Sequence, residues 1–299
     1  MENFNLRKLI NTLLCACALL AVSPAALAEW MGNTDVSIQH DSNINNGELD
    51  SDVKEATSLS VNVSATDFFA LEDGKNVSVT LNAKGEGFDH YSGLNNLALG
   101  ASLSLRKKWA LGPFAPWVGA SLSTTHLNYA NNIRNGWRHQ LALRSGKRVT
   151  ERLNVQGELM AEQRDANPLT PDIPWLSGDV FSQTSSALSL NAEYVLNDDI
   201  FMTFGTMLRR GGIAATATES QKIIDASDAA AADPVLSFGP HVYAYRLNGT
   251  TRGVSASMAF SLLDPHSTLQ MTLSRFVTHA NGDNNYAKNV QMISWNHNF

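Results

Sequence analysis

The sequence predicts an all-β protein, a transmembrane antiparallel up-and-down β-barrel of about twelve strands. Three observations predict this fold. The chain of 299 residues opens on a short apolar segment, it then alternates polar and apolar residues over many long stretches, and the connections between these stretches are alternately tight and long. A period of two puts the polar and apolar sets on opposite faces of a strand, as a barrel between lipid and a watery lumen requires.

Residues 1–28 predict a cleaved export signal. Arg7 and Lys8 precede a mostly apolar run from Leu9 to Val22, and residues 26–28 supply a small-residue cleavage site. The apolar run is short for a transmembrane helix, which needs roughly 20 apolar residues. We therefore assign residues 1–28 to a signal peptide and residues 29–299 to one barrel domain.

The composition excludes several functions. Both cysteines, Cys15 and Cys17, lie in the predicted signal, so the mature chain has no thiol for a disulfide or a metal site. The net charge of −6 becomes −7 without the signal, which gives no support for nucleic-acid binding. A mean hydropathy of −0.16 suits a barrel, because only every second residue of a barrel strand faces lipid. We expect no cofactor, no metal and no nucleic-acid partner.

Alternation is clearest in six segments of the mature chain. In the third of them, Leu97, Leu99 and Leu103 face one way while Ser102 and Ser104 face the other. A secreted β-sandwich also alternates. The barrel is favoured because these segments exceed the usual strand length of about five or six residues. The segments are residues 58–66, 77–84, 97–106, 153–162, 188–194 and 254–262.

Turn residues predict the number of strands. Tight connections rich in Gly, Asn, Asp and Pro lie at residues 71–76, 111–114, 145–148, 196–199 and 263–266. Looser segments lie at residues 43–52, 91–95, 129–135, 166–179, 211–239 and 280–287. Together they separate twelve strands and place both termini at the end with tight turns, which should be periplasmic. A hairpin turn at Asn248-Gly249-Thr250 would instead give thirteen strands.

The segment 211–239 is the longest predicted connection. Its alanine-rich composition allows a short helix at 219–232. A loop of this length is usually functional or disordered. It can fold into the barrel as a constriction or lie outside as a surface loop.

The C-terminus carries a resemblance to a known class. Ile293, Trp295, His297 and Phe299 alternate and end on an aromatic carboxy-terminus. This pattern resembles the terminal strand of Gram-negative outer-membrane β-barrel proteins, porin-like in type, which the barrel-assembly machinery reads as a sorting signal. The resemblance implies an outer-membrane location, contact with outer-membrane lipid and lipopolysaccharide, and the assembly machinery as a partner during biogenesis.

Charges of both signs lie on the predicted inner face. Opposed charges in a water-filled lumen select solutes, which favours a narrow passive diffusion channel for small polar solutes. Alternatively, the charges form an internal network that closes the barrel, and the protein is then an adhesin or a scaffold. The predicted pore-lining residues are Lys84, Glu86, Arg106, Arg138, Arg144, Glu158, Glu162, Arg164 and Glu193.

Two His-x-Ser pairs raise the alternative of a lipid hydrolase. His40 with Ser42, and His90 with Ser92, would share one face of a strand near the predicted outer rim. A serine nucleophile needs such a base within reach. Outer-membrane phospholipases and lipid A deacylases resemble this chain in size. Solvated loop residues explain both pairs equally simply.

Aromatic residues near the predicted strand ends suit the two interfacial belts of a membrane barrel. They are Trp30, Tyr91, Trp109, Trp117, Tyr129, Trp137, Tyr194, Phe201 and Trp295.

Overall fold

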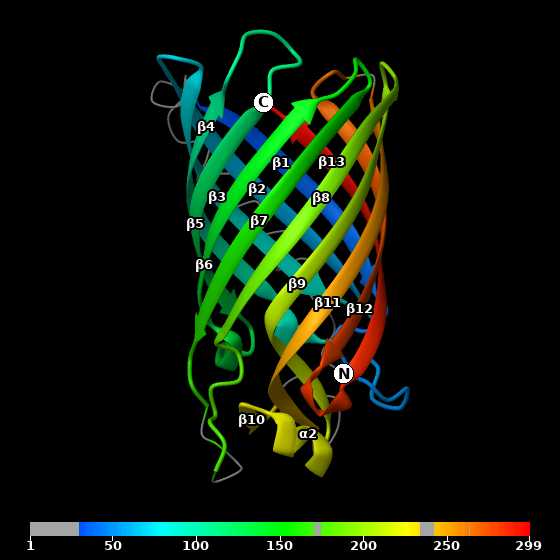
Figure 1. Ribbon diagram of the computed structural model, residues 1–299. Helices are drawn as coiled ribbons and strands as arrows, with labels where there is room; N and C mark the ends of the chain where they lie inside the picture. Colours follow the sequence, from blue (N-terminus) through cyan, green and yellow to red (C-terminus); the bar gives the residue numbers. More distant parts are fainter. Residues whose placement is uncertain (1–29, 170, 172–174, 234–241, 263) are drawn as a thin grey trace.

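Twelve antiparallel strands close into one barrel (Figure 1). The computed structural model describes residues 30–299 except 170, 172–174, 234–241 and 263. Each strand pairs with its neighbour in the chain, β13 closes the ring on β1, and β11 follows β9 directly in the ring. The strands are β1 (Met31–Asp41), β2 (Ala56–Leu71), β3 (Lys75–Phe88), β4 (Asn96–Lys108), β5 (Trp117–Tyr129), β6 (Gly136–Arg148), β7 (Leu153–Ala166), β8 (Gln183–Asn197), β9 (Ile200–Thr218), β11 (Val242–Ser261), β12 (Ser267–Ala280) and β13 (Asn285–Asn298).

The outer face of the barrel is apolar, as the alternation predicts. Leu99, Leu122 and Leu273 are exposed, and they alternate with smaller polar residues along their strands. Hydroxyl side chains meet on the inner face, for example Ser37 and Ser60, whose oxygens are 2.8 Å apart. The predicted transmembrane up-and-down barrel of twelve strands is confirmed. No helix in the described part of the chain is long and apolar enough to cross a membrane.

The strand register decides between twelve strands and the thirteen that a hairpin turn at Asn248-Gly249-Thr250 would give. β11 continues through Asn248 and Gly249, which pair with Gly212 and Gly211 of β9. No hairpin turn forms there, because both residues pair with β9 and Gly249 also pairs with Ala280 of β12. The ring therefore keeps an even number of strands.

The tight turn predicted at residues 145–148 is wrong. β6 continues to Arg148, and residues 149–152 connect it to β7. Gly146 lies opposite Trp117 of β5, and a Cβ on this glycine would stand 2.8 Å from the Trp117 ring. The glycine therefore permits a close side-chain approach inside a strand.

Both described ends of the chain lie at the end of the barrel that carries the short turns. Gly32 and Phe299 exchange backbone hydrogen bonds of 2.8 and 3.0 Å. The longer connections lie at the opposite end, which we call the mouth. They include three short 3-10 helices, Ser92–Leu94, Asn132–Arg134 and Asn281–Asp283. The predicted signal peptide lies outside the described residues.

A separate unit covers the mouth. The outer ends of β9 and β11, with α2 (Gln221–Ala226) and β10 (Ala229–Ala232), form what we call the lid, residues 212–233 and 242–248. β10 pairs with β11 on the edge opposite to β9, so the lid contains a small three-stranded sheet. Figure 1 shows α2 and β10 at the lower end of the barrel, where β9 and β11 curve.

The helix predicted at 219–232 is only partly correct. Residues 221–226 are helical, but Ala229–Ala232 form a strand. These alanines pair with residues 243–246 of β11, and Ala229 and Ala230 are fully buried. Pairing with an unoccupied strand edge outweighs the weak helical propensity of a short alanine run.

Candidate functional site

The candidate site is the lumen beneath the lid. The nine residues predicted to line a pore all lie on the strand face opposite to the exposed leucines. By strand they are Lys84 and Glu86 (β3), Arg106 (β4), Arg138 and Arg144 (β6), Glu158, Glu162 and Arg164 (β7), and Glu193 (β8). The small alternating residues of these strands leave the lumen open to such long side chains.

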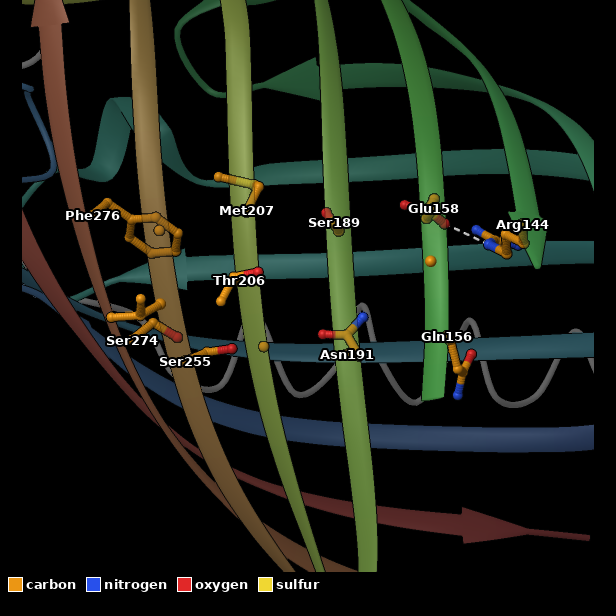
Figure 2. Close-up of a pocket in the computed structure, with 14 residues that line it drawn as sticks. Arg144, Gln156, Glu158, Ser189, Asn191, Thr206, Met207, Ser255, Ser274 and Phe276 are labelled. Atoms are coloured by element: carbon orange, nitrogen blue, oxygen red, sulfur yellow. Dashed lines mark hydrogen bonds and ion pairs between the residues drawn. The ribbon is translucent and has the colours of Figure 1, made fainter. Parts of the chain in front are cut away.

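Two pairs of these charges lie within ion-pair distance, one across neighbouring strands and one along a single strand. Arg144 Nε donates to Glu158 Oε2 at 2.5 Å (Figure 2). Lys84 Nζ lies 3.4 Å from Glu86 Oε2. Arg144 and Glu158 are directly opposed in the register of β6 and β7, which brings the two charges together.

A second kind of contact occurs near the end with short turns. The Arg106 guanidinium lies 4.2 Å from the centre of the Trp117 ring, which is a cation–π distance. Trp117 shares the inner face with Gly119 and Ser121, because Leu122 of the same strand is on the outer face. The assignment of Trp117 to an outer aromatic belt is therefore wrong.

Further inner charges were missed from the sequence. Lys288 Nζ lies 2.8 Å from Asp41 Oδ2 and joins β13 to β1, and Arg209 of β9 donates to the Gly212 carbonyl. Lys288 directly follows a segment that the sequence predicted as a loop, residues 280–287. Near the mouth the outer face of β13 is polar (Asn289, Gln291), so polarity alternation no longer separates the faces.

Two adjoining cavities occupy this part of the lumen. The first has a volume of about 270 Å³ and is lined by Arg144 and Glu158 on one side and Phe276 on the other (Figure 2). The second, about 510 Å³, lies toward the mouth and is lined by Arg209, Tyr286 and Lys288 among others. They share Met207, Ser274 and Phe276 as walls. The described lumen therefore has room for a small polar molecule with charges of both signs around it.

Two inner arginines lie next to each other toward the mouth. Arg138 of β6 and Arg164 of β7 are directly opposed in the register. Arg164 Nη2 donates to the Arg134 carbonyl at 2.8 Å, and its guanidinium lies 5.5 Å from the Tyr129 ring. Two like charges at this spacing repel each other, which an anion between them would relieve.

The lid is held by loops from several parts of the ring. Thr216 N donates to the Asn45 carbonyl at 2.8 Å, and Asn45 Nδ2 donates to the Thr216 carbonyl at 2.7 Å. Asn45 belongs to the β1–β2 connection, which three strands separate from β9 in the ring. The lid therefore crosses the mouth.

On another side of the mouth an ion pair holds the lid. Arg134 Nη2 lies 2.6 Å from Asp233 Oδ2. The Asp233 side chain is fully buried and that of Arg134 is 12% exposed. A charge in such a position needs its partner.

Hydrophobic side chains form the interior of the lid. One cluster includes Ile223, Tyr245 and Leu247, and a second joins Phe181 of the β7–β8 connection to Ala244. Gly211 marks where β9 leaves the wall: its φ is +139°, and a Cβ there would stand 2.3 Å from the Thr184 carbonyl. Only glycine adopts this backbone without strain.

The His-x-Ser pairs are not brought together by hydrogen bonds in the described part of the chain. His40 Nδ1 lies 3.3 Å from Thr57 Oγ1, and the Ser42 hydroxyl accepts from the Asn289 N–H. His90 lies beside Asp89, with 3.7 Å between Nε2 and Oδ2. Ser92 begins a 3-10 helix. Among the described residues, no three His, Cys, Asp or Glu side chains are grouped so that they could hold a metal ion.

The C-terminal residues lie on the outer face of β13. Ile293, Trp295 and Phe299 are exposed there. His297, in the same row, stacks on Trp295 and lies 2.9 Å from the Ser267 hydroxyl. The row is therefore continuous and largely apolar, with polar contacts from His297 to Ser267 of β12 and to Asp264 of the β11–β12 turn.

Comparison with known proteins identifies the fold. No family model matches the sequence, and no curated protein matches it. An outer-membrane channel from Pseudomonas putida F1 is 14% identical, with a TM-score of 0.56 over 93% of this chain and 100% of that one. The NanC porin is 11% identical, with a TM-score of 0.48 over 88% and 98%, and the CymD monoaromatic hydrocarbon channel is 10% identical, with a TM-score of 0.46 over 94% and 92%. This chain has the porin-like β-barrel fold of outer-membrane channels.

Proposed function

We propose that the protein is a passive diffusion channel for small polar solutes in the outer membrane. The observation that carries the proposal is the closed ring with two adjoining cavities, of about 270 and 510 Å³, lined by charges of both signs. The similar structure from Pseudomonas putida F1 is described as an outer-membrane channel, which supports this reading.

The lumen would act by partial desolvation and charge selection, without a covalent step. A solute that passes Arg144 and Glu158 exchanges some of its water for contacts with these side chains. Solutes whose charges complement both Arg144 and Glu158 lose the least solvation free energy in this exchange. Toward the mouth, Arg138 and Arg164 favour solutes with a negative group.

Export and orientation complete the proposal. Residues 1–28 would be removed after export, and the end with short turns and both termini would face the periplasm. Outer-membrane lipid and lipopolysaccharide would surround the wall, and the barrel-assembly machinery would read the row Ile293, Trp295 and Phe299 during biogenesis.

Planar-bilayer recordings of the refolded mature chain test the channel. We expect ohmic steps whose ion selectivity shifts toward cations in Arg144→Gln and toward anions in Glu158→Gln. Arg152→Gln is the matched control, because Arg152 is an exposed charge in the β6–β7 turn outside the lumen.

The lid requires a second variant. If the wild type does not conduct, Tyr245→Ala loosens the lid while the wall stays intact. If neither the wild type nor Tyr245→Ala conducts although both barrels are correctly folded, the channel proposal is overturned and the closed scaffold is favoured. Lipid hydrolysis that is lost in His40→Ala or His90→Ala would instead support the hydrolase.

A further inference from the structure

We propose that three arginines on the outer face of the wall bind the phosphate groups of an acylated lipid of the outer leaflet. They are Arg210 of β9, Arg252 of β11 and Arg275 of β12, on three adjacent strands of the ring. This inference rests on the proposed membrane location and orientation of the barrel, and it is independent of what passes through the lumen.

The strand register places the three arginines in one row. Arg210 pairs with Thr250, two residues from Arg252 on β11, and Arg252 pairs with Val277, two residues from Arg275 on β12. Such diagonal neighbours on one face lie about 7–8 Å apart. All three are exposed and share their face with Leu208, Val254 and Leu273, which is 62% exposed.

The row lies close to the mouth. Arg210 directly precedes Gly211, where β9 leaves the wall, Arg252 follows Gly249 by three residues, and Arg275 precedes the end of β12 at Ala280 by five. A strand rises about 3.3 Å per residue, so the three guanidinium groups lie within a few residues of the mouth. In the proposed orientation, with the mouth outward, this places them toward the headgroups of the outer leaflet. Long basic side chains near a membrane boundary extend toward that level.

Among the described residues, none of the three arginines is in an ion pair. The hydrogen bond that is present joins Arg275 Nη1 to Asn289 Oδ1 at 3.3 Å. The outer face of strands β8, β9, β11, β12 and β13 carries no Asp or Glu in the described chain. Three exposed like charges in a row can therefore bind an external anion, and a phosphate accepts two hydrogen bonds from one guanidinium.

A groove beside the row supplies the apolar part of the site. It has a volume of about 520 Å³ and crosses the outer face from β5 to β9, where Arg210 lines its end. Leu122, Leu141 and Ala161 form its apolar part, and its polar part includes His139, Gln163 and Ser186. Glu162 also lines the groove, and its carboxylate accepts a hydrogen bond from Gln140 Nε2. An acyl chain fits along the leucines while a phosphate meets Arg210. A second copy of this chain fits the arginine row less well, because the strands around the row carry no outer-face carboxylate in the described chain. Asp165 of β7 is an exposed outer-face carboxylate near the groove, where it accepts a hydrogen bond from Gln163.

Native mass spectrometry of the refolded mature chain in neutral detergent tests the site. The probe is diphosphoryl lipid A, with the same lipid after removal of its phosphates and inorganic phosphate as separate arms. We expect the diphosphoryl lipid to bind and the triple variant Arg210→Gln/Arg252→Gln/Arg275→Gln to bind it about 100-fold more weakly. The control is Lys147→Gln/Arg148→Gln/Arg152→Gln, which removes the same charge at the end with short turns and should leave affinity unchanged.

Three outcomes overturn the proposal. Equal binding of the lipid without phosphates shows that the arginines are not used. Displacement of the lipid by inorganic phosphate shows a simple anion site in which the groove has no part. A lipid-free dimer that dissociates in the arginine variant, measured by light scattering, shows an interface between copies. A folded triple variant is recognised by its unchanged heat-dependent mobility in gels, so loss of folding does not imitate loss of binding.

Discussion

The wall and the lid of this protein bury opposite kinds of side chain. In the wall, large apolar residues such as Leu122 and Leu273 face outward and are exposed, while the interior is polar and charged. In the lid, Tyr245 and Leu247 are completely buried. Both clusters of buried hydrophobic residues in the described chain lie in the lid and the connection packed against it.

The difference follows from the solvent of each region. Lipid surrounds the wall, so apolar side chains gain nothing by turning inward, and the closed ladder of backbone hydrogen bonds holds the strands together. Water surrounds the mouth, so the lid is stabilised by the ordinary hydrophobic effect. The lid should therefore open as a unit without unfolding the wall.

The largest expected effect comes from Tyr245→Ala. Removing a fully buried aromatic side chain typically costs about 3–5 kcal/mol, here in the free energy of lid opening. Hydrogen exchange in detergent should show faster exchange at Ala229–Ala232 and unchanged exchange in β2 to β7. Leu273→Ala on the lipid face is the control and should leave the lid amides unchanged. Equal acceleration in the wall would show that lid and wall are one cooperative unit.

The ion pair of the lid should give the next largest effect. In Asp233→Asn the Arg134 guanidinium loses its buried partner, and we expect a loss of about 3 kcal/mol in the same opening equilibrium. A double-mutant cycle with Arg134→Gln isolates the coupling between the two side chains. The lumen pair Arg144 and Glu158 is half-exposed, and its cycle should yield about 1 kcal/mol or less. A larger coupling in the lumen than in the lid would contradict the comparison.

The smallest effect concerns a turn of the wall. Hydrogen bonds from the His266 N–H and the Ser267 hydroxyl lower the pKa of Asp264 in the β11–β12 turn. A lowered folded-state pKa adds stability above the unfolded-state value and loses it as the pH falls, here below about 4. Urea titrations in lipid vesicles should show a slightly weaker acid-side loss in Asp264→Asn than in the wild type. An identical pH dependence would show that the turn does not contribute.

Most strands of the wall could be predicted from the sequence alone. Leu97 to Arg106 and Leu153 to Glu162 alternate because each strand meets lipid on one side and water on the other. The same alternation located the inner charges Arg144 and Glu158. Turn residues were misleading at Gly146, which suggests a turn but accommodates the Trp117 ring, a contact made across strands.

What the sequence by itself determined was the class of fold, the face of most residues and the end of the barrel at which the chain stops. These properties depend on a period of two and on turn chemistry, which are local. Only the tertiary structure decided that Ala229–Ala232 form a strand, that Asn45 holds Thr216 across the mouth, and that Arg210, Arg252 and Arg275 form one row. These depend on the register between strands, and register is set by the closure of the whole ring.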